Sequence, residues 1–356
     1  MSGTLYATGD LIDGRYRILG FHREGGMQEV YRAEDTLLQR IVALKSPKND
    51  SANRRFKGTA VISAQINHRH VAKTLDYIED DRRPALVEEF IEGEDLQKIL
   101  QRTFVMLAPS MAARVLHQMA KGLLAAHNAG VIHRDLKPSN LMIEGGASLA
   151  QVKITDFGIS KMAEEEIRDW SEGDKTIMSK TVFGAIPYMA PESIRSFRAS
   201  DQPSDVWALG AMTYEMLTGQ KPFGEGLAAT AEILSGRPPP RPAFIGQRQF
   251  KGLGVEIFEL LCECMSQDPA LRPTASGLVS KCEALCYPQD AHEFGAISVR
   301  DNQYWGFIQP DEGGGVFWHR DSFYGPGPSA VGQRVCYVRH TGAGNDRAFP
   351  LVIVKH

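Results

Sequence analysis

A chain of 356 residues with 43% hydrophobic and 23% charged residues is long enough for two or three domains with ordinary cores. Its 40 basic and 43 acidic residues give a formal net charge of −3, which excludes a chain-wide basic surface for nucleic acid or anionic membrane. No apolar run approaches the roughly 18 residues that span a bilayer, and the N-terminal segment is not a signal peptide. Five scattered cysteines are typical of free thiols in a reducing compartment, so we expect a cytoplasmic protein without membrane partners.

The sequence predicts that the first part of the chain forms a mostly β lobe with one helix. β-branched and aromatic residues predict strands at residues 16–21, 30–33, 41–45, 73–78 and 85–90. A helical stretch at about residues 52–66 separates the third strand from the fourth.

The pattern becomes helical from residue 97 onward. Apolar residues recur at helical spacing over residues 110–129, and further helices are predicted at 204–217, 230–234, 255–265 and 275–284. The segment 156–192 is long, polar and without periodicity, which is typical of a loop. From residue 293 short strand-like runs are separated by Gly, Pro and Asp, and these predict a further all-β domain at 293–356.

Two motifs in the helical part carry chemistry. Residues 133–140 read His-Arg-Asp-Leu-Lys-Pro-Ser-Asn, and Asp156-Phe157-Gly158 follows sixteen residues after Asn140. Together they place a potential base, a cation and two potential metal ligands on adjacent loops, as phosphoryl transfer from ATP requires. On these residues the chain resembles the protein kinase family, and Lys137, two residues after Asp135, matches its serine/threonine branch.

The resemblance implies an α+β bilobal fold followed by the small β domain. A tail at residues 1–13 would precede a kinase domain at 14–287, with an N-lobe at 14–92 and a C-lobe at 93–287. It also implies ATP and Mg²⁺ as cofactors, serine or threonine hydroxyls of proteins as substrates, and a possible homodimer. Asp135 would be the base, Lys137 would neutralise the transferring phosphoryl group, and Asn140 and Asp156 would hold Mg²⁺.

Further positions match the family's nucleotide-binding and supporting residues. The match implies that Lys45 binds the α- and β-phosphates, that Glu89 and Ile91 form the hinge along adenine, and that apolar residues sandwich the ring: Val30, Ala43 and Met142. It also implies three structural residues around the activation segment: Glu192 of Ala190-Pro191-Glu192, its partner Arg272, and Asp205, which braces the catalytic loop.

The chain departs from the family in the Gly-rich loop. Of three expected glycines only Gly25 remains; Arg23 and Gln28 occupy the flanking positions. We therefore expect a looser or differently shaped cover over the phosphates.

A second departure concerns the partner of Lys45. The helix position at which the family has glutamate is Thr59, and residues 51–75 contain no acidic residue. Glu88 falls at the usually apolar position at the back of the nucleotide pocket, so one hypothesis is that Glu88 pairs with Lys45. The alternative is a shifted register or a solvent-facing Glu88.

The activation segment provides the third departure and a regulatory expectation. Ala185 replaces the threonine that normally contacts the catalytic aspartate and lysine, so we expect one contact that positions these residues to be lost. Arg134 before Asp135 implies control by phosphorylation, for which Thr176, Ser179 and Thr181 are candidates. A degraded kinase that acts as a nucleotide-binding switch remains an alternative.

The C-terminal domain carries two aromatic runs, Tyr304-Trp305-Gly306-Phe307-Ile308 and Val316-Phe317-Trp318-His319. These resemble the nucleic-acid motifs of cold-shock domains, which are five-stranded OB-type barrels that bind single-stranded RNA or DNA. Strand alternation directs four rings to one face as a stacking platform, Trp305, Phe307, Phe317 and His319, with Val316 and Trp318 filling the barrel.

Other features favour a different use of the barrel. Its first strand has Val299 and Arg300 where the family has aromatic residues, and Arg320 follows His319 in place of phenylalanine. Residues 293–356 carry six basic and six acidic residues, so little counterion release is available. The alternatives are an aromatic face that docks on the kinase lobes or on a protein partner, and an RNA-binding regulator controlled by the kinase lobes.

Overall fold

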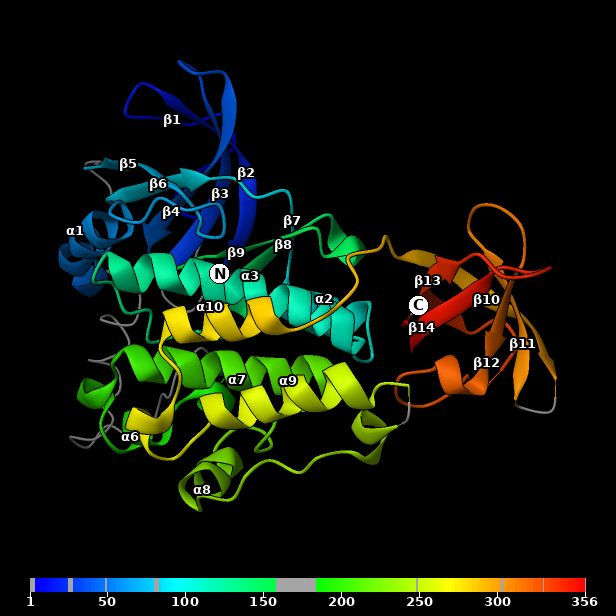
Figure 1. Cartoon of the computed structure of the whole chain (residues 1–356). Coiled ribbons are helices and arrows are strands. Elements are labelled where there is room, and N and C mark those ends of the chain that lie inside the picture. Colours follow the sequence, from blue (N-terminus) through cyan, green and yellow to red (C-terminus); the bar gives the residue numbers. More distant parts are fainter. Residues whose placement is uncertain are drawn as a thin grey trace.

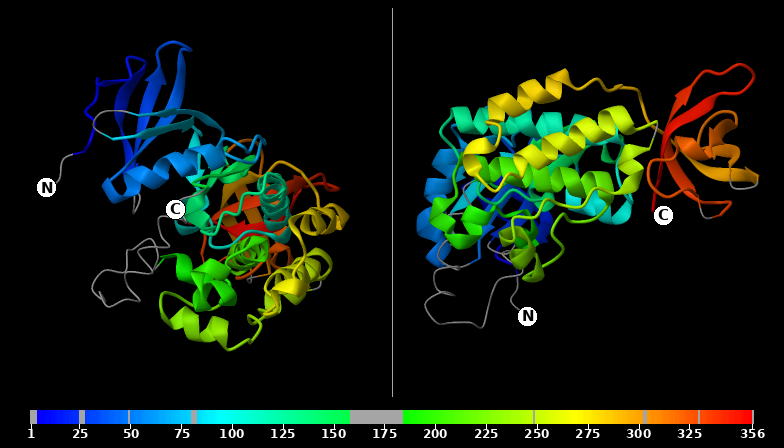
Figure 2. Two further views of the ribbon diagram at one scale, coloured as in Figure 1. Left: turned by 90° about the vertical axis from the view of Figure 1, so that its left-hand side faces the viewer. Right: turned by 60° about the horizontal axis from the view of Figure 1, so that its bottom comes forward.

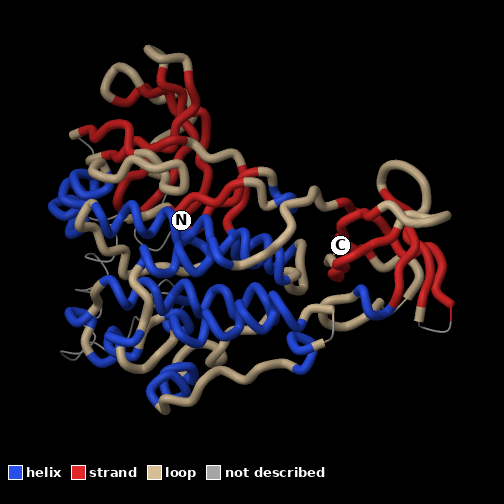
Figure 3. The backbone as a smooth tube through the Cα atoms, in the orientation of Figure 1, coloured by secondary structure: helices blue, strands red, loops and turns tan. Residues whose placement is uncertain are grey.

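The computed structural model describes residues 4–24, 28–48, 50–79, 83–157, 184–247, 249–301, 304–328 and 330–355, without the side chains of 50–55, 59 and 197. A strand-rich lobe lies above a helical lobe, and a β-barrel lies at one end of the helical lobe (Figure 1). The strands gather in the upper lobe and the barrel, and the helices in the lower lobe (Figure 3).

The upper lobe is a six-stranded antiparallel sheet with one helix beside it. Its strand order is β1-β2-β3-β4-β6-β5. The elements are β1 (Leu11–Ile12), β2 (Tyr16–Glu24), β3 (Gln28–Asp35), β4 (Arg40–Pro47), α1 (Asp50–Ser63), β5 (Thr74–Ile78) and β6 (Ala85–Glu89). Alternating apolar side chains of β2 and β3, such as Ile18 and Tyr31, bury one face of the sheet.

Residues 4–13, which the sequence assigns to a tail, pack against this sheet. Leu11 and Ile12 pair with β2 as a short edge strand. Tyr6 is buried, its ring contacts the Tyr31 ring edge-on, and its backbone N–H donates to the Tyr31 hydroxyl. The segment packs because Tyr6 contributes a large apolar surface to the core of the lobe.

The lower lobe is built on two helices that are buried along most of their length. Its elements are β7 (Gly93–Asp95), α2 (Leu96–Arg102), α3 (Pro109–Asn128), β8 (Leu141–Glu144), β9 (Gln151–Ile154), α6 (Pro191–Arg195), α7 (Gln202–Thr218), α8 (Ala228–Leu234), α9 (Lys251–Cys264) and α10 (Ala275–Ala284). α3 and α7 pack against each other, and α9 and α10 cover them. A small sheet, β7-β8-β9, lies on α3 beneath the upper lobe.

The sequence predicts the longer elements but misses this small sheet. The predicted helices at 110–129, 204–217 and 275–284 correspond to α3, α7 and α10. β8 and β9 have only four residues each, and most of these side chains are buried, so no alternation marks them as strands.

The C-terminal region is a closed five-stranded barrel, as the sequence predicts. Its elements are β10 (Glu293–Asp301), β11 (Trp305–Pro310), β12 (Val316–His319), β13 (Arg334–His340) and β14 (Arg347–Ile353). They close in the order β10-β11-β12-β14-β13. Val316 and Trp318 are fully buried inside, whereas Phe317 and His319 face outward, as strand alternation requires.

The barrel docks on the helical lobe through a continuous apolar core. Tyr324 packs edge-on against Phe244 and Phe250, and Phe349 stacks on Phe250 at 5.5 Å between ring centroids. The backbones of Phe104 and Val354 also pair in an isolated antiparallel β-bridge. The docking surface lies on the side of the barrel away from β11 and β12 (Figures 1 and 2).

Candidate active site

The loop that carries His133 and Asp135 is fixed from below by α7. The buried carboxylate of Asp205 accepts the backbone N–H groups of His133 at 2.9 Å and Arg134 at 2.8 Å. His127 contacts the same carboxylate at 3.0 Å. Arg134 has φ 64°, a left-handed conformation that costs a non-glycine residue energy, so the two hydrogen bonds offset that cost and confirm the bracing that the resemblance implies.

Asp135, Lys137 and Asn140 form one cluster above this brace. The Lys137 ammonium donates to both carboxylate oxygens of Asp135 at 2.9 and 2.8 Å. The Asn140 amide nitrogen donates to the Asp135 backbone carbonyl at 2.8 Å and to its carboxylate at 3.2 Å. These contacts hold the Asp135 carboxylate in one orientation, and the amide orientation leaves the Asn140 side-chain oxygen as a potential ligand for a cation.

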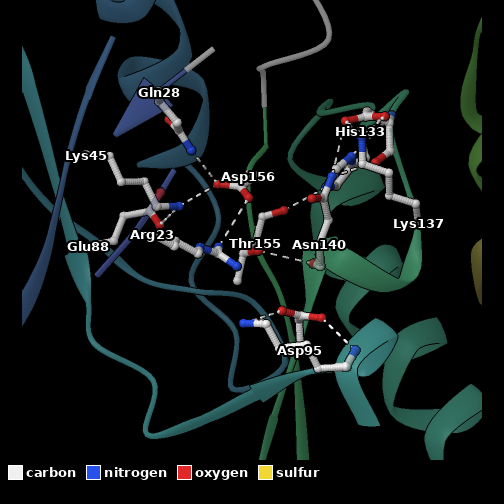
Figure 4. A network of polar contacts seen from close by, with 12 residues as sticks. Arg23, Gln28, Lys45, Glu88, Asp95, His133, Lys137, Asn140, Thr155 and Asp156 are labelled. Carbon is white, nitrogen blue, oxygen red and sulfur yellow. Dashed lines mark hydrogen bonds and ion pairs between the residues drawn. The ribbon is translucent and has the colours of Figure 1, made fainter. Parts of the chain in front are cut away.

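Asp156 lies opposite this cluster and is contacted by three side chains of the upper lobe (Figure 4). Lys45 Nζ lies 2.6 Å and Gln28 Nε2 3.0 Å from its Oδ1, and the Arg23 guanidinium lies 3.7 Å from Oδ2. Burial favours the neutral form, but Lys45, then Arg23, outweigh it and hold the pKa of Asp156 far below its usual value. Asp156 is therefore an anion.

Asp156 is positioned by its neighbour in the chain. The Phe157 ring is buried and packs against the His133 ring at 4.6 Å between centroids. The Ser63 hydroxyl on α1 donates to the Phe157 carbonyl at 3.3 Å. This packing anchors the backbone that presents Asp156, which itself has φ 65°.

Glu88 pairs with Lys45, so the predicted contact is confirmed. Their charged groups lie 2.6 Å apart, and both residues are only 4% exposed, which rules out a solvent-facing Glu88. Ala43 of β4 lies opposite Glu88 of β6 in register, two residues from Lys45, so the pair forms between neighbouring strands. Thr59 lies within α1, but its side chain is outside the part that the structure describes.

Burial and neighbouring charges have opposite effects on the pKa values of Glu88 and Lys45. Burial raises the pKa of Glu88, which Lys45 partly reverses. For Lys45 burial lowers the pKa, but Asp156 and Glu88 outweigh it and the pKa is raised. Lys45 is therefore a cation between two carboxyl groups.

The positions predicted to sandwich adenine are apolar and close to one another. Ala72, Ile91 and Met142 form a small cluster, and Val30 and Ala43 are buried on the strands above it. The Glu89 side chain accepts two hydrogen bonds from Lys153 at 2.8 Å, and its backbone N–H donates to the Lys73 carbonyl at 2.9 Å. These apolar side chains match the flat, apolar faces of a nucleobase.

The end of the activation segment has the predicted ion pair. Arg272 donates to both oxygens of Glu192 at 2.6 and 2.8 Å, and its guanidinium lies over the Trp207 ring. Ala185 is buried and contributes no hydroxyl. The candidate phosphorylation sites Thr176, Ser179 and Thr181, and Gly25 of the Gly-rich loop, lie outside the described residues.

The predicted aromatic platform is assembled on the barrel. Trp305 stacks on Phe317 at 6.1 Å between centroids, and Phe307 packs edge-on against both rings. His319 lies opposite Trp305 in register. Because the kinase lobes contact other residues of the barrel, the proposed docking of this face on the lobes is wrong.

Sequence reasoning missed two site residues, Arg23 and Gln28. Both were interpreted as lost glycines, yet both reach Asp156. The available signal was their chemistry, because long hydrogen-bond donors replaced glycine on both sides of a phosphate loop.

The fold has two lobes, and between them the buried Lys45 and the Asp156 carboxylate face the cluster of Asp135, Lys137 and Asn140. This arrangement defines a phosphotransferase of the kinase class. The family model for the protein kinase domain matches residues 16–282, and the chain belongs to that family. Within the described residues, no helix is both long and apolar enough to cross a membrane.

Bacterial kinases are among the similar proteins. The chain is 34% identical over 281 residues to serine/threonine-protein kinase PknA of Mycobacterium tuberculosis, covering 76% of this chain and 60% of PknA. It is 31% identical over 278 residues to serine/threonine-protein kinase pkn3 of Myxococcus xanthus, covering 75% and 49%. It is 34% identical over 230 residues to PrkC of Bacillus subtilis, covering 63% and 33%. The chain thus spans less than two thirds of the length of these relatives.

Proposed function

We propose that this chain is a protein kinase that transfers the γ-phosphate of ATP to serine or threonine hydroxyls of proteins, with Mg²⁺ as cofactor. The observation that carries the proposal is the set of four charged side chains and one amide at the lobe interface: Asp135, Lys137, Asp156, Lys45 and Asn140. Carboxylate and amide oxygens are the ligands that Mg²⁺ prefers, and Asn140 and Asp156 supply them. Bound there, Mg²⁺ would supply positive charge to the transferring phosphoryl group.

The other residues would orient and neutralise the reactants. Asp135 accepts the proton of the substrate hydroxyl, and Lys137, held on Asp135 at 2.8 Å, lies close enough to offset negative charge at the same centre. Lys45 binds the phosphates, and Val30, Ala43 and Met142 enclose adenine along the backbone of Glu89 and Ile91. Glu88 holds Lys45 in place of the helix glutamate.

A phosphorylation assay with radiolabelled ATP and Mg²⁺ tests the activity. Wild type should phosphorylate itself or a general protein substrate, and Asp135→Asn should lose at least a hundredfold in rate, because general-base catalysis contributes about 10²–10⁴. Asp290→Asn, which changes an exposed carboxylate, is the matched control and should keep full activity. Incorporation by neither wild type nor Asp135→Asn would instead support a nucleotide-binding switch.

The same proposal includes the domain boundaries, the compartment and the regulation of the kinase. We place the kinase domain at residues 14–287, with residues 4–13 packed on its N-lobe, in a cytoplasmic protein, and the barrel at 293–356. Arg134 would pair with a phosphate on Thr176, Ser179 or Thr181, in a homodimer if activation occurs in trans. The buried Arg134 Nε has no hydrogen-bond partner among the described residues, which favours such a phosphate ligand.

A second function is favoured by the aromatic cluster of the barrel. Three rings in mutual contact on an outward face form a surface on which unpaired bases can stack. We propose that Trp305, Phe307, Phe317 and His319 bind single-stranded RNA or DNA in the manner of a cold-shock domain.

A titration with single-stranded RNA tests the stacking surface. Trp305→Ala and Phe307→Ala should each weaken binding about tenfold, because base stacking contributes about 1–3 kcal/mol per base. Phe21→Ala, an exposed aromatic residue of the upper lobe, is the control. If none of the variants changes the affinity, the aromatic face serves a protein partner instead.

A further inference from the structure

Two long polar side chains stand where the Gly-rich loop of a kinase has glycine, and both turn into the site. Arg23 lies at the end of β2 and Gln28 at the start of β3, and both approach the carboxylate of Asp156 (Figure 4). The adjacent Glu24 is largely exposed and pairs with Lys48. Arg23 and Gln28 instead share Asp156 as a partner.

A local irregularity of the sheet accounts for the direction of Arg23. The register between β2 and β3 shifts between Phe21 and Arg23, which then lies opposite Val30. Such a bulge redirects the side chains that follow it. Arg23 thus lies beside the pocket residue Val30 with its side chain only 26% exposed.

The charges around Asp156 are unusual because of Arg23. Lys45 lies between two carboxyl groups, Glu88 and Asp156, and contacts both at 2.6 Å. Arg23 places a second cation beside the ionised Asp156. At 3.7 Å its contact with Asp156 is an ion pair without hydrogen-bond geometry, and the described residues accept no hydrogen bond from its guanidinium.

We propose that Arg23 binds the phosphate oxygens of the nucleotide, replacing the backbone contacts that the missing glycine would allow. A guanidinium presents N–H donors in a planar fork that matches phosphate oxygens. It lies beside the metal-type carboxylate, which is the place where a Mg²⁺-bound polyphosphate meets the protein. Gln28, only 6% exposed, is a positioning residue that holds Asp156 through its Oδ1 at 3.0 Å.

This inference rests on the nucleotide binding of the proposed function. It is tested by comparing a ligand that has phosphates with one that has none. Dissociation constants of full-length protein for ATP with Mg²⁺ and for adenosine are measured by calorimetry. Arg23→Ala should weaken ATP binding about tenfold, the effect of losing one charge-assisted contact of about 1.4 kcal/mol. Because adenosine lacks phosphates, the dissociation constant of Arg23→Ala for adenosine should stay within about twofold of the wild-type value.

Two further variants separate charge from backbone freedom. Arg23→Gly restores the residue of the family and should weaken ATP binding as much as Arg23→Ala does, whereas Arg23→Lys should keep part of the affinity. Arg17→Ala, an exposed residue of the same strand that pairs with Glu34, is the control.

The inference is overturned if Arg23→Ala keeps the wild-type affinity for ATP, or if it weakens the binding of adenosine as much as that of ATP. It is also overturned if Arg23→Gly binds ATP more tightly than wild type does. Any of these with an active wild type leaves the proposed kinase function intact. A wild type that binds no nucleotide overturns both.

Discussion

A buried lysine requires a carboxylate, and in this protein Lys45 has one on the neighbouring strand of its own sheet. Glu88 of β6 contacts Lys45 at 2.6 Å. A contact within one sheet does not depend on the position of α1. We therefore expect the lysine to stay aligned when that helix moves, unlike a kinase in which the helix carries the carboxylate.

Replacing Glu88 tests this expectation. Glu88→Met should lower kcat/KM for ATP at least tenfold, because Lys45 loses one of two buried partners, and should also destabilise the fold. Removing a partner from a buried ion pair costs about 3–5 kcal/mol, and retention of Asp156 places this change at the lower end. Initial rates against ATP concentration and urea unfolding provide the measurements.

Glu79→Met is the matched control, because Glu79 is an exposed partner of Lys57. If Glu88→Met does not fold, Glu88→Gln keeps the shape and removes the charge. Unchanged turnover and ATP affinity in a folded Glu88 variant would contradict the assigned role.

His70 gives the fold a pH dependence. Burial lowers the pKa of His70 from its ordinary 6.5 to about 4, while its Nδ1 contacts the Val152 carbonyl at 2.9 Å. Between these two pH values the unfolded chain binds a proton that the folded chain does not. The free energy of unfolding should therefore fall by about 2–3 kcal/mol as the pH decreases from 6.5 to 4.

His70→Gln should remove that part of the pH dependence, so the free energy of unfolding should fall less between pH 6.5 and 4. Urea unfolding at half-unit pH intervals measures the difference. His292, whose pKa burial also lowers to about 4, leaves a residual slope.

At the scale of elements, α3 approaches the upper lobe closely because it has glycine at one position. A Cβ at Gly122 would lie 2.6 Å from the His70 carbonyl oxygen and 3.0 Å from the Ile154 side chain. A carbonyl of the backbone cannot move as a flexible side chain can. The helix therefore depends on glycine here for packing, although glycine weakens helices.

Gly122→Ala should lower the free energy of unfolding by about 1–3 kcal/mol, because overpacking outweighs the gain in helix propensity. Gly58→Ala is the matched change in α1, where a Cβ meets nothing within 4 Å, and should instead stabilise by up to about 1 kcal/mol. Thermal and urea unfolding of the two variants should show opposite signs. The same sign in both would contradict the packing argument.

Elements of this protein were predictable where a periodic pattern or a motif was long. α3 and α7 repeat apolar residues over several turns, and residues 133–140 matched a family motif. β8 and β9 were missed because four residues with most side chains buried show no alternation. Arg23 and Gln28 were missed because a β-bulge, which no local pattern marks, sets the direction of Arg23, and Asp156 is distant in sequence.

At the scale of the whole molecule, the barrel and the helical lobe share one core. Tyr324 of the barrel is 1% exposed between Phe244 and Phe250. Lys355 donates through its backbone to the Thr103 carbonyl at 2.7 Å and through its ammonium to the Leu100 carbonyl at 2.8 Å. We expect the lobe and the barrel to unfold in one transition.

Two substitutions at Tyr324 test the shared core. Tyr324→Ala should destabilise both parts by about 3–5 kcal/mol through cavity formation. The buried Tyr324 hydroxyl has no hydrogen-bond partner in the described part of the chain, so Tyr324→Phe should be neutral or stabilising. Calorimetry should show one unfolding peak that shifts as a whole, and a separate early peak for the barrel would contradict the shared core.

The bridge between Phe104 and Val354 also sets an order of events during synthesis. These partners are 250 residues apart, so the ribosome completes the helical lobe before it adds the strand that covers Phe104 and Phe250. At typical rates of about 5–20 residues per second, that face stays uncovered for several seconds or longer. A nascent chain halted before residue 349 should therefore bind chaperones, and completion of β14 should release it.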